Sequence, residues 1–339
     1  MKRATGGSKR TVAIALGVNL VVAVAKGAVG VISGSGVLLS EAAHSVADTL
    51  NEGFLFIALQ RSGRPADDQH PFGYGKERFF WSLLAAVGIF VAGAMFSFFE
   101  GYRTLSGSSG GETSFIGPYV VLGIAGGLEG TSWLRAVRQL RREARAQRHG
   151  IIEHIRISDD PTVKTVASED SAALAGVLIA VSGVLLHQFT GNGLFEGIAS
   201  LLIGVLLGGV AVALGRDNMG LLIGESAAPA VRQGLLAELR AFPEVDGVID
   251  LLTMRIGTSQ LLVAARLDFG RRLSSDEIEL LSARIEQRIH QSFPQVQQIF
   301  LDPTAGSDQP ARTRRAARES ATNWAYPGPG YPPDSRAAG

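Results

Sequence analysis

Apolar runs long enough to cross a bilayer dominate the first two thirds of the chain. A transmembrane helix needs about 20 mostly apolar residues, and 46% of the 339 residues are hydrophobic whereas only 19% are charged. Six runs meet this requirement, so the sequence predicts an α-helical polytopic membrane protein with six transmembrane helices. The runs are residues 11–32, 37–59, 79–102, 115–137, 163–186 and 194–214.

The distribution of Lys and Arg predicts the orientation of these helices. Basic residues gather in the N-terminal segment 1–10 and in the loops after the second and fourth runs, and basic loops remain in the cytoplasm. We therefore expect an integral protein of a bacterial plasma membrane with both termini cytoplasmic. It would consist of a cytoplasmic tail (1–10) and a membrane domain (11–216). The first run is too long for a signal peptide, which favours a retained span.

The second run contains a polar face. Glu41, His44 and Asp48, followed by Asn51 or Glu52, recur at intervals of three or four residues and would share one side of a helix. Ionisable groups at membrane depth are costly, and they persist mainly where they pair, line a cavity or bind an ion. A His and an Asp one turn apart offer ligands that suit zinc, iron, cobalt or manganese. The alternatives are a pair of groups that form hydrogen bonds between helices, and a helix end that lies in water.

A second acidic site is predicted in the fifth run. Its purely apolar part, 172–186, is too short to cross a membrane, so the helix must extend back through Glu169 and Asp170. If the helix begins at Pro161, Asp170 lies about 13 Å along it. Asp48 also lies about halfway across. We therefore predict that His44, Asp48 and Asp170 form one metal site, with N and O ligands only because the chain has no Cys.

The remaining third of the chain has the pattern of a small soluble domain and a tail. Residues 230–241 and 275–292 read as helices, and residues 247–256, 260–268 and 296–301 read as strands. The order αββαβ predicts a cytoplasmic α+β domain of ferredoxin-like type over 217–303. The segment 304–339 is rich in Pro, Gly and Arg and is expected to be disordered.

Lys26 is a basic residue inside the first run. It lies seven residues after Asn19, so the two side chains would share a helix face. Lys26 is expected either to pair with an acid such as Glu100 or to extend its ammonium to the headgroups.

Two motifs resemble those of the cation diffusion facilitator family. Gly34-Ser35-Gly36 with the stretch 40–48 is similar to the family's metal motif in the second helix, and residues 70–77 (HPFGYGKE) are similar to its cytoplasmic signature. The resemblance covers most of the chain, from about 11 to 303. Residues 169–173 and 190–192 are similar to the zinc transporter nine branch.

This resemblance implies a divalent metal cation efflux transporter, with Zn²⁺ favoured over Fe²⁺, Mn²⁺ or Co²⁺. It implies exchange of the metal for protons by alternating access, and a homodimer formed through the C-terminal domain. The metal is cargo, so no cofactor is expected, and a net charge of +1 gives no signal for nucleic acid. A passive cation channel and an intramembrane metalloenzyme are the alternative functions, although the chain lacks a His-Glu-x-x-His motif.

The resemblance also implies roles for individual residues and includes departures from the family pattern. Val166 stands where family members commonly have a His, so the fourth ligand is unassigned, and Glu169, Asn51 and Glu41 are candidates. Glu169 would point about 100° away from Asp170.

Other implied roles lie at the cytoplasmic side. Asp67 and His70 match a cytoplasmic loop metal site, but Tyr74 replaces its second His, and a loop Asp and His could instead be capping residues. Lys76 and Glu225 are candidates for a charge interlock between the third and sixth helices. The alternative there is an exposed pair or a Lys that anchors a span in the headgroups.

Overall fold

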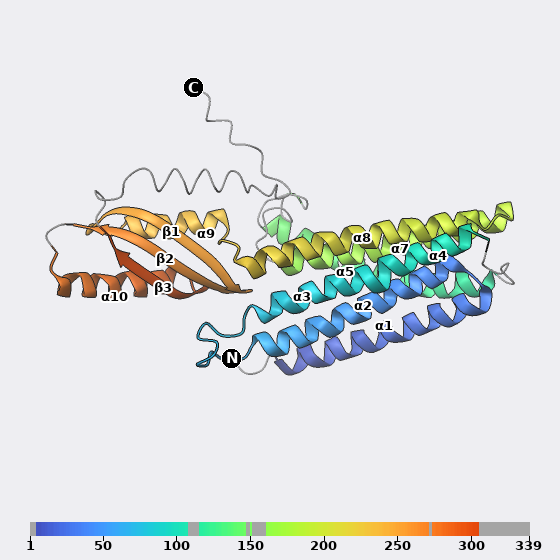
Figure 1. Cartoon of the computed structure of the whole chain (residues 1–339), viewed down its shortest axis with the longest axis horizontal. Coiled ribbons are helices and arrows are strands. Elements are labelled where there is room, and N and C mark those ends of the chain that lie inside the picture. Colours follow the sequence, from blue (N-terminus) through green and yellow to red (C-terminus); the bar gives the residue numbers. More distant parts are fainter. Residues whose placement is uncertain (1–4, 108–114, 147–149, 151–160, 271–272, 305–339) are drawn as a thin grey trace, which may run out of the picture. The chain divides into compact units, whose positions relative to one another are not determined.

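The computed structural model describes residues 5–107, 115–146, 150, 161–270 and 273–304 (Figure 1). The chain forms two compact units. The first comprises Met1–Ala228 with Met254–Leu261, and the second comprises Pro229–Thr253 with Leu262–Gly339. The predicted disordered tail, apart from Thr304, lies outside the described residues, as do residues 1–4 of the predicted N-terminal tail.

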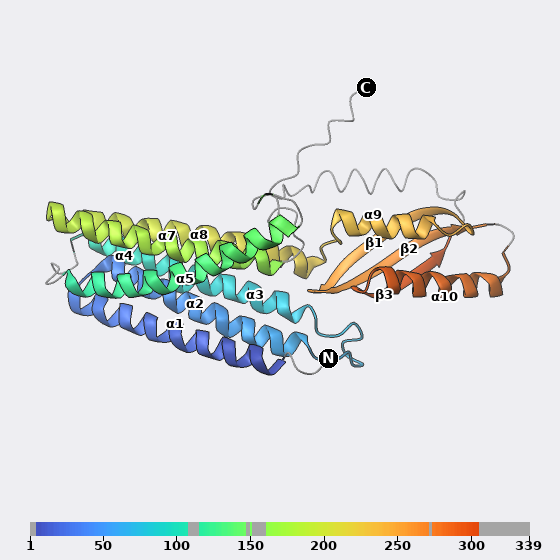
Figure 2. The ribbon, with the colours of Figure 1, turned by 180° about the vertical axis from the view of Figure 1, so that it is seen from behind.

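The first unit is a bundle of long helices, seen from two sides in Figures 1 and 2. Helix α2 contacts α1, α3, α4, α7 and α8, so it lies at the centre of the bundle, and its polar face is therefore surrounded by protein. The helices are α1 (Thr5–Ser33), α2 (Gly36–Ser62), α3 (Glu77–Gly88), the π-helix η1 (Ile89–Met95), α4 (Phe96–Leu105), α5 (Ile116–Ala146), α7 (Pro161–Thr190) and α8 (Leu194–Ile223).

Three helical stretches among the described residues are long and apolar enough to cross a membrane. They are Glu77–Leu105, Glu169–Thr190 and Leu194–Ile223, and α1 contributes a shorter apolar piece, Asn19–Ser33. Helix α2 is not among them because Glu41, Asp48 and Glu52 interrupt its apolar sequence. The prediction of six transmembrane helices is therefore supported at three of them and otherwise stays a prediction.

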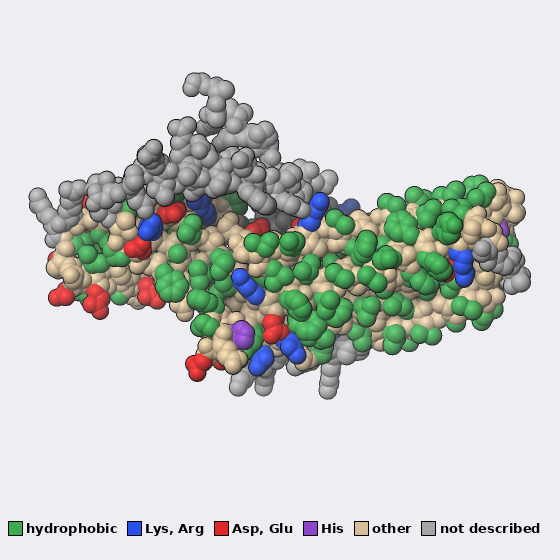
Figure 3. Space-filling view, viewed as in Figure 1, with side chains coloured by type: hydrophobic (Ala, Val, Ile, Leu, Met, Phe, Trp, Pro, Cys, Tyr) green, Lys and Arg blue, Asp and Glu red, His purple; other side chains and the backbone are tan. Residues whose placement is uncertain are grey.

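The outer surface of the bundle is apolar. Figure 3 shows hydrophobic side chains over much of the visible face of these helices. Phe99, Tyr102, Val205 and Ile223 are each more than half exposed, at 59%, 72%, 62% and 75%. An apolar surface of this extent would be unfavourable in water, and it is the surface expected of helices in contact with lipid.

The predicted helix start at Pro161 is confirmed, because α7 begins at that residue. The preceding Asp159 and Asp160 lie outside the described residues. The third predicted span is helical throughout, but η1 interrupts its α-helical hydrogen bonding, and no feature of the sequence indicated a π-helix there. Gly101 in α4 packs against Gly197 in α8, where a Cβ on Gly101 would lie 3.0 Å from the Gly197 carbonyl oxygen. The absence of side chains lets these two backbones approach closely.

The second unit contains the predicted αββαβ order. Its elements are α9 (Pro229–Arg240), β1 (Val245–Gly257), β2 (Gln260–Phe269), α10 (Ser275–Ser292) and β3 (Val296–Pro303). The strands form one sheet in the order β1-β2-β3. Alternate residues of β2 are buried, from Leu261 to Phe269, so one face of the sheet carries the core. The order is confirmed, whereas the assignment to the ferredoxin-like type stays a prediction.

The start of α10 is set by a capping box that the sequence indicated. The Ser274 side chain accepts a hydrogen bond from the Glu277 backbone N–H, and the Glu277 carboxylate accepts one from the Ser274 backbone N–H at 2.7 Å. This second hydrogen bond holds the pKa of Glu277 below its usual range. The pair satisfies two amide groups that would otherwise lack a partner in the first turn.

We predict that Ser274→Ala destabilises the first turn of α10 by about 0.5–2 kcal/mol, because the side-chain acceptor at the N-cap is lost. The measurement is hydrogen exchange of the α10 amides in the intact protein. Ser275→Ala, one residue later, is the matched control, and equal protection loss in the two variants would contradict the assignment of the cap.

Candidate metal centre

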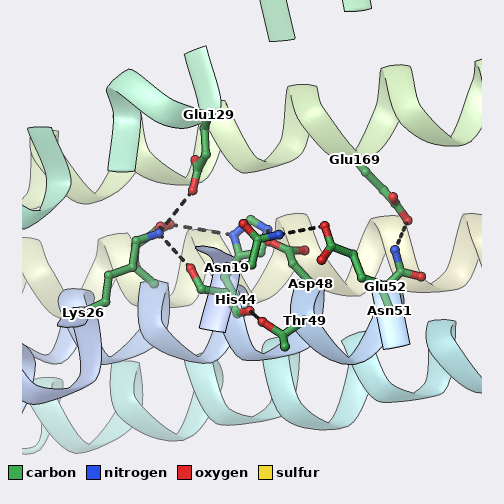
Figure 4. Close-up of polar contacts among 11 residues, drawn as sticks. Asn19, Lys26, His44, Asp48, Thr49, Asn51, Glu52, Glu129 and Glu169 are labelled. Atoms are coloured by element: carbon green, nitrogen blue, oxygen red, sulfur yellow. Dashed lines mark hydrogen bonds and ion pairs between the residues drawn. The ribbon is translucent and has the colours of Figure 1, made fainter. Parts of the chain in front are cut away.

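Helix α2 presents His44 and Asp48 to the interior of the bundle, as predicted from their spacing. His44 Nε2 lies 3.5 Å from Asp48 Oδ2, one helical turn along the chain, and the His44 side chain is 5% exposed. On the preceding turn, Glu41 Oε1 lies 3.9 Å from His44 Nδ1, which is too long for a hydrogen bond. Glu41 is fully buried. The imidazole and two carboxylates thus follow one face of the central helix, and Figure 4 shows His44 and Asp48 on that face.

Helix α7 approaches this face through a glycine. A Cβ on Gly176 would lie 2.6 Å from Glu41 Oε1 and 3.2 Å from His44 Nδ1, so any side chain there would displace them. Two turns earlier, Asn51 Nδ2 donates a hydrogen bond to Glu169 Oε1 at 3.0 Å. These two contacts bracket Asp48 on α2 and Asp170 on α7. The two aspartates therefore lie at similar depth along the bundle.

Asp170 does not point toward α2 in this structure. Its Oδ2 accepts a hydrogen bond from Ser132 Oγ of α5 at 3.4 Å. The reason is helical phase. Glu169 lies seven residues, or two turns, before Gly176, so both residues are on the side of α7 that meets α2. Asp170 lies six residues before Gly176, so its side chain points about 120° away from that side. Glu169 and Asp170 point in different directions, as expected for neighbours on a helix, but it is Glu169 rather than Asp170 that faces α2.

The predicted ligands are consequently only partly brought together. The structure places His44 beside Asp48, but among the described residues no group of three or more His, Asp or Glu side chains is arranged to hold a metal ion. Of the candidates for a fourth ligand, Asn51 and Glu169 are hydrogen-bonded to each other, and Glu41 accepts a hydrogen bond from Lys26. Val166 belongs to the part of α7 whose side chains lie outside the described residues.

Lys26 is buried at this centre rather than at a membrane surface. Its ammonium donates hydrogen bonds to Glu41 Oε2 at 2.9 Å, Ser45 Oγ at 3.0 Å and Glu129 Oε1 at 3.3 Å (Figure 4). The expected pairing of Lys26 with an acid is confirmed, but the acids are Glu41 and Glu129. Glu100, the example named from the sequence, instead forms an ion pair with Arg103 one turn away on α4. The expected shared face of α1 is confirmed, since Asn19 also faces α2 and donates to Glu52 at 2.9 Å.

Two buried acidic residues were not among those predicted from the sequence. Glu129 in α5 forms an ion pair with Lys26. It could have been found from the sequence as an acidic residue inside an otherwise apolar run. Glu196, in the first turn of α8, is buried and accepts a hydrogen bond from Ser35 Oγ at 2.6 Å. Its other oxygen lies 2.6 Å from His187 Nδ1. This second cluster joins the turn before α2 to the adjacent ends of α7 and α8.

The candidate loop site is organised around Asp67. Its Oδ1 accepts hydrogen bonds from the backbone N–H of Gln69 and of His70 at 3.1 and 2.8 Å, and its Oδ2 accepts one from the Tyr74 hydroxyl at 2.6 Å. The Tyr74 hydroxyl holds the pKa of Asp67 below its usual range, and the same hydrogen bond raises the pKa of Tyr74. The His70 ring lies 3.4 Å from Asp67. This geometry matches the alternative reading, a carboxylate that caps a turn.

The candidate interlock is not formed in this structure. Among the ion pairs of the described residues, none joins Lys76 to Glu225, and the Lys76 ammonium instead lies 3.9 Å from the sulfur of Met254. Glu225 follows directly after Gly224, which ends α8 with a positive φ of 120°.

Comparison with known proteins identifies the family. The model of the cation efflux transmembrane domain matches residues 12–223, which is more than half of the chain. The protein therefore belongs to the cation efflux, or cation diffusion facilitator, family, and it is an integral membrane protein. The resemblance expected from the two motifs is confirmed, and the family is one of transporters rather than of enzymes.

Individual relatives support the same assignment. The chain is 35% identical over 265 residues to "Proton-coupled zinc antiporter SLC30A9, mitochondrial" of Xenopus laevis, covering 76% of this chain and 47% of the relative. The chain is 34% identical over 270 residues to the human protein of the same name, covering 79% of this chain and 46% of the relative. "Metal tolerance protein C4" of Arabidopsis thaliana is 36% identical over 266 residues, covering 78% and 58%. The chain spans about half the length of these relatives.

We predict that Tyr74→Phe raises the pKa of Asp67 toward its ordinary value, because the shortest hydrogen bond to the ionised carboxylate is removed. A depressed pKa means that the ionised carboxylate stabilises the folded loop above the unfolded-state pKa, and that this contribution is lost as the pH falls through the folded-state pKa. The Phe variant should therefore lose loop order at a higher pH than the wild type. The measurement is NMR titration of ¹³C-labelled Asp, with Tyr102→Phe as control. An unchanged Asp67 titration would contradict the prediction.

Proposed function

We propose that the protein is a divalent metal cation efflux transporter that exchanges metal, most favourably Zn²⁺, for protons. The observation that carries the proposal is the pair of buried His44 and half-buried Asp48 on α2, 3.5 Å apart, in the central helix of a cation efflux domain. An imidazole and a carboxylate one turn apart are suitable ligands for zinc and for iron, manganese or cobalt. The names of the relatives from Xenopus and human favour zinc.

The complete metal site would need a ligand from α7. Asp170 lies at the depth of Asp48, and a rotation of α7 that releases the Asp170 side chain from Ser132 would direct it toward α2. We propose His44, Asp48 and Asp170 as the ligands of the transported ion. Glu169 and Asn51 are bonded to each other and border this position, so they are suited to complete or to orient the coordination.

Proton exchange follows from the chemistry of these ligands. A carboxylate and an imidazole must lose their protons before they bind a metal, so protons and metal compete for the same groups. Alternating access of a mid-membrane site to the two sides would turn this competition into antiport. We propose that metal is loaded from the cytoplasm, across a bacterial plasma membrane, with both termini cytoplasmic. The basic loops of the sequence support this orientation.

We predict that Asp48→Asn and Asp170→Asn each reduce zinc transport at least about tenfold, because each removes an anionic ligand without changing side-chain size. The measurement is Zn²⁺ flux into proteoliposomes with an imposed pH gradient, at several metal concentrations. Asp68→Asn in the exposed loop is the matched control.

The same assay separates the alternatives. Normal transport by Asp170→Asn together with loss in Glu169→Gln would transfer the α7 ligand role to Glu169. Zinc flux that neither moves protons nor responds to the pH gradient would favour a passive channel and contradict antiport.

We further propose that two copies of the chain associate through the open face of the sheet in the second unit. Leu252 of β1 and Phe300 of β3 are 61% and 52% exposed, which is a substantial apolar area for a sheet face outside the core. A symmetric dimer would bury the same residues from each copy.

We predict that Leu252→Glu raises the dimer dissociation constant at least about tenfold, since burying a leucine side chain is worth about 1.5–3 kcal/mol and a charge is costly to bury. The measurement is mass by light scattering in detergent across a dilution series. Leu280→Glu on the exposed side of α10 is the matched control, and an unchanged dimer in the Leu252 variant would exclude this face.

A further inference from the structure

The Lys26 ammonium has surroundings that resemble those of a bound cation. Three oxygens lie within 3.3 Å of Nζ: Glu41 and Ser45 belong to α2, and Glu129 belongs to α5. The Lys26 and Glu41 side chains are 1% and 0% exposed, so this ion pair is shielded from bulk solvent. All three neighbouring atoms are oxygens that accept hydrogen bonds from the ammonium and that could equally coordinate a metal cation. They belong to α2 and α5, both of which contact α1.

Negative groups outnumber positive ones around this ammonium. Among the described residues, the hydrogen bonds and ion pairs of this region involve five acidic side chains and two basic ones, Lys26 and His44. Three buried carboxylate oxygens have no hydrogen-bond partner among the described residues: Glu41 Oε1, Glu52 Oε2 and Glu129 Oε2. Carboxylate oxygens without a partner are costly in a low-dielectric interior, so this region favours the binding of cations. The five acids are Glu41, Asp48, Glu52, Glu129 and Glu169.

We propose that Lys26 is a tethered cation that fills a second cation position, formed by Glu41, Ser45 and Glu129, beside the His44–Asp48 pair. It thereby limits the protein to one transported ion and keeps Glu41 out of that ion's coordination. This inference rests on the proposed function, because it concerns the number of metal ions that the chain binds. Lys26 acts here as a determinant of stoichiometry and specificity, in addition to joining α1, α2 and α5.

The chemistry of the second position differs from that of the central pair. It offers two carboxylates and a hydroxyl but no nitrogen, and all-oxygen sites suit Mn²⁺ and Mg²⁺ better than they suit zinc. Removal of the ammonium would leave Glu41 and Glu129 to repel each other with no cation between them. A free divalent ion would then be the natural replacement.

The test is the number of ions bound by the full-length protein, measured by equilibrium dialysis with Zn²⁺ and with Mn²⁺. The wild type should bind one Zn²⁺ per protomer. Lys26→Met, which keeps the length of the side chain but not its charge, should bind about one additional Mn²⁺ per protomer. The further change Glu129→Gln should abolish this gain, because it removes one carboxylate of the second position. Lys26→Arg should behave as wild type, and Lys76→Met is the matched control for removing a lysine charge.

The outcomes separate this proposal from the proposed function. If Lys26→Met binds the same number of ions as the wild type with the same affinity, Lys26 only joins helices and the proposal is overturned. A single ion bound more tightly would make Glu41 a ligand of the central ion, and would likewise overturn a separate position. If Lys26→Met does not fold, Lys26→Gln, which can still donate to Glu41, replaces it. A wild type that binds no Zn²⁺ would contradict the proposed function instead.

Discussion

The cost of keeping charges inside a membrane governs this structure. Most estimates place that cost at several kcal/mol for an isolated charge, so each buried ionisable group needs a partner. Lys26 meets that need for Glu41 and Glu129, and these contacts hold α1, α2 and α5 in a defined arrangement. The helix that carries the polar face is therefore placed at the centre of the bundle, where protein rather than lipid surrounds it.

Gly176 then allows α7 to lie close to the polar face of α2. Gly176 allows the α7 backbone to approach Glu41 and His44, and this contact lies on the side of α7 that faces α2. With α7 in this orientation, Glu169 faces Asn51, and Asp170 faces Ser132 on α5. Which side chains pair across the site thus depends on how α7 packs at Gly176, two turns away from Glu169 and Asp170.

This dependence explains what could be predicted from the sequence and what could not. Helix boundaries, the capping box at Ser274 and the proximity of His44 to Asp48 follow from local spacing, because three or four residues bring side chains onto one face of any helix. The partner of Lys26 and the direction of Asp170 depend on helix rotation, which is set by contacts between residues distant in sequence. The π-helix over Ile89–Met95 likewise has no local signature in its apolar sequence.

The two buried acidic clusters differ in a way that bears on which of them handles ions. Both oxygens of Glu196 are occupied, by Ser35 and by His187 at 2.6 Å each, so that carboxylate has little capacity for another ligand. At the centre, by contrast, Glu41, Glu52 and Glu129 each retain a buried oxygen without a hydrogen-bond partner among the described residues. A satisfied cluster stabilises one arrangement of helices, whereas an unsatisfied one favours the arrival of a cation or a proton. This difference favours the α2 face as the place of the proposed ion chemistry, and the Glu196 cluster is suited to holding helix ends together.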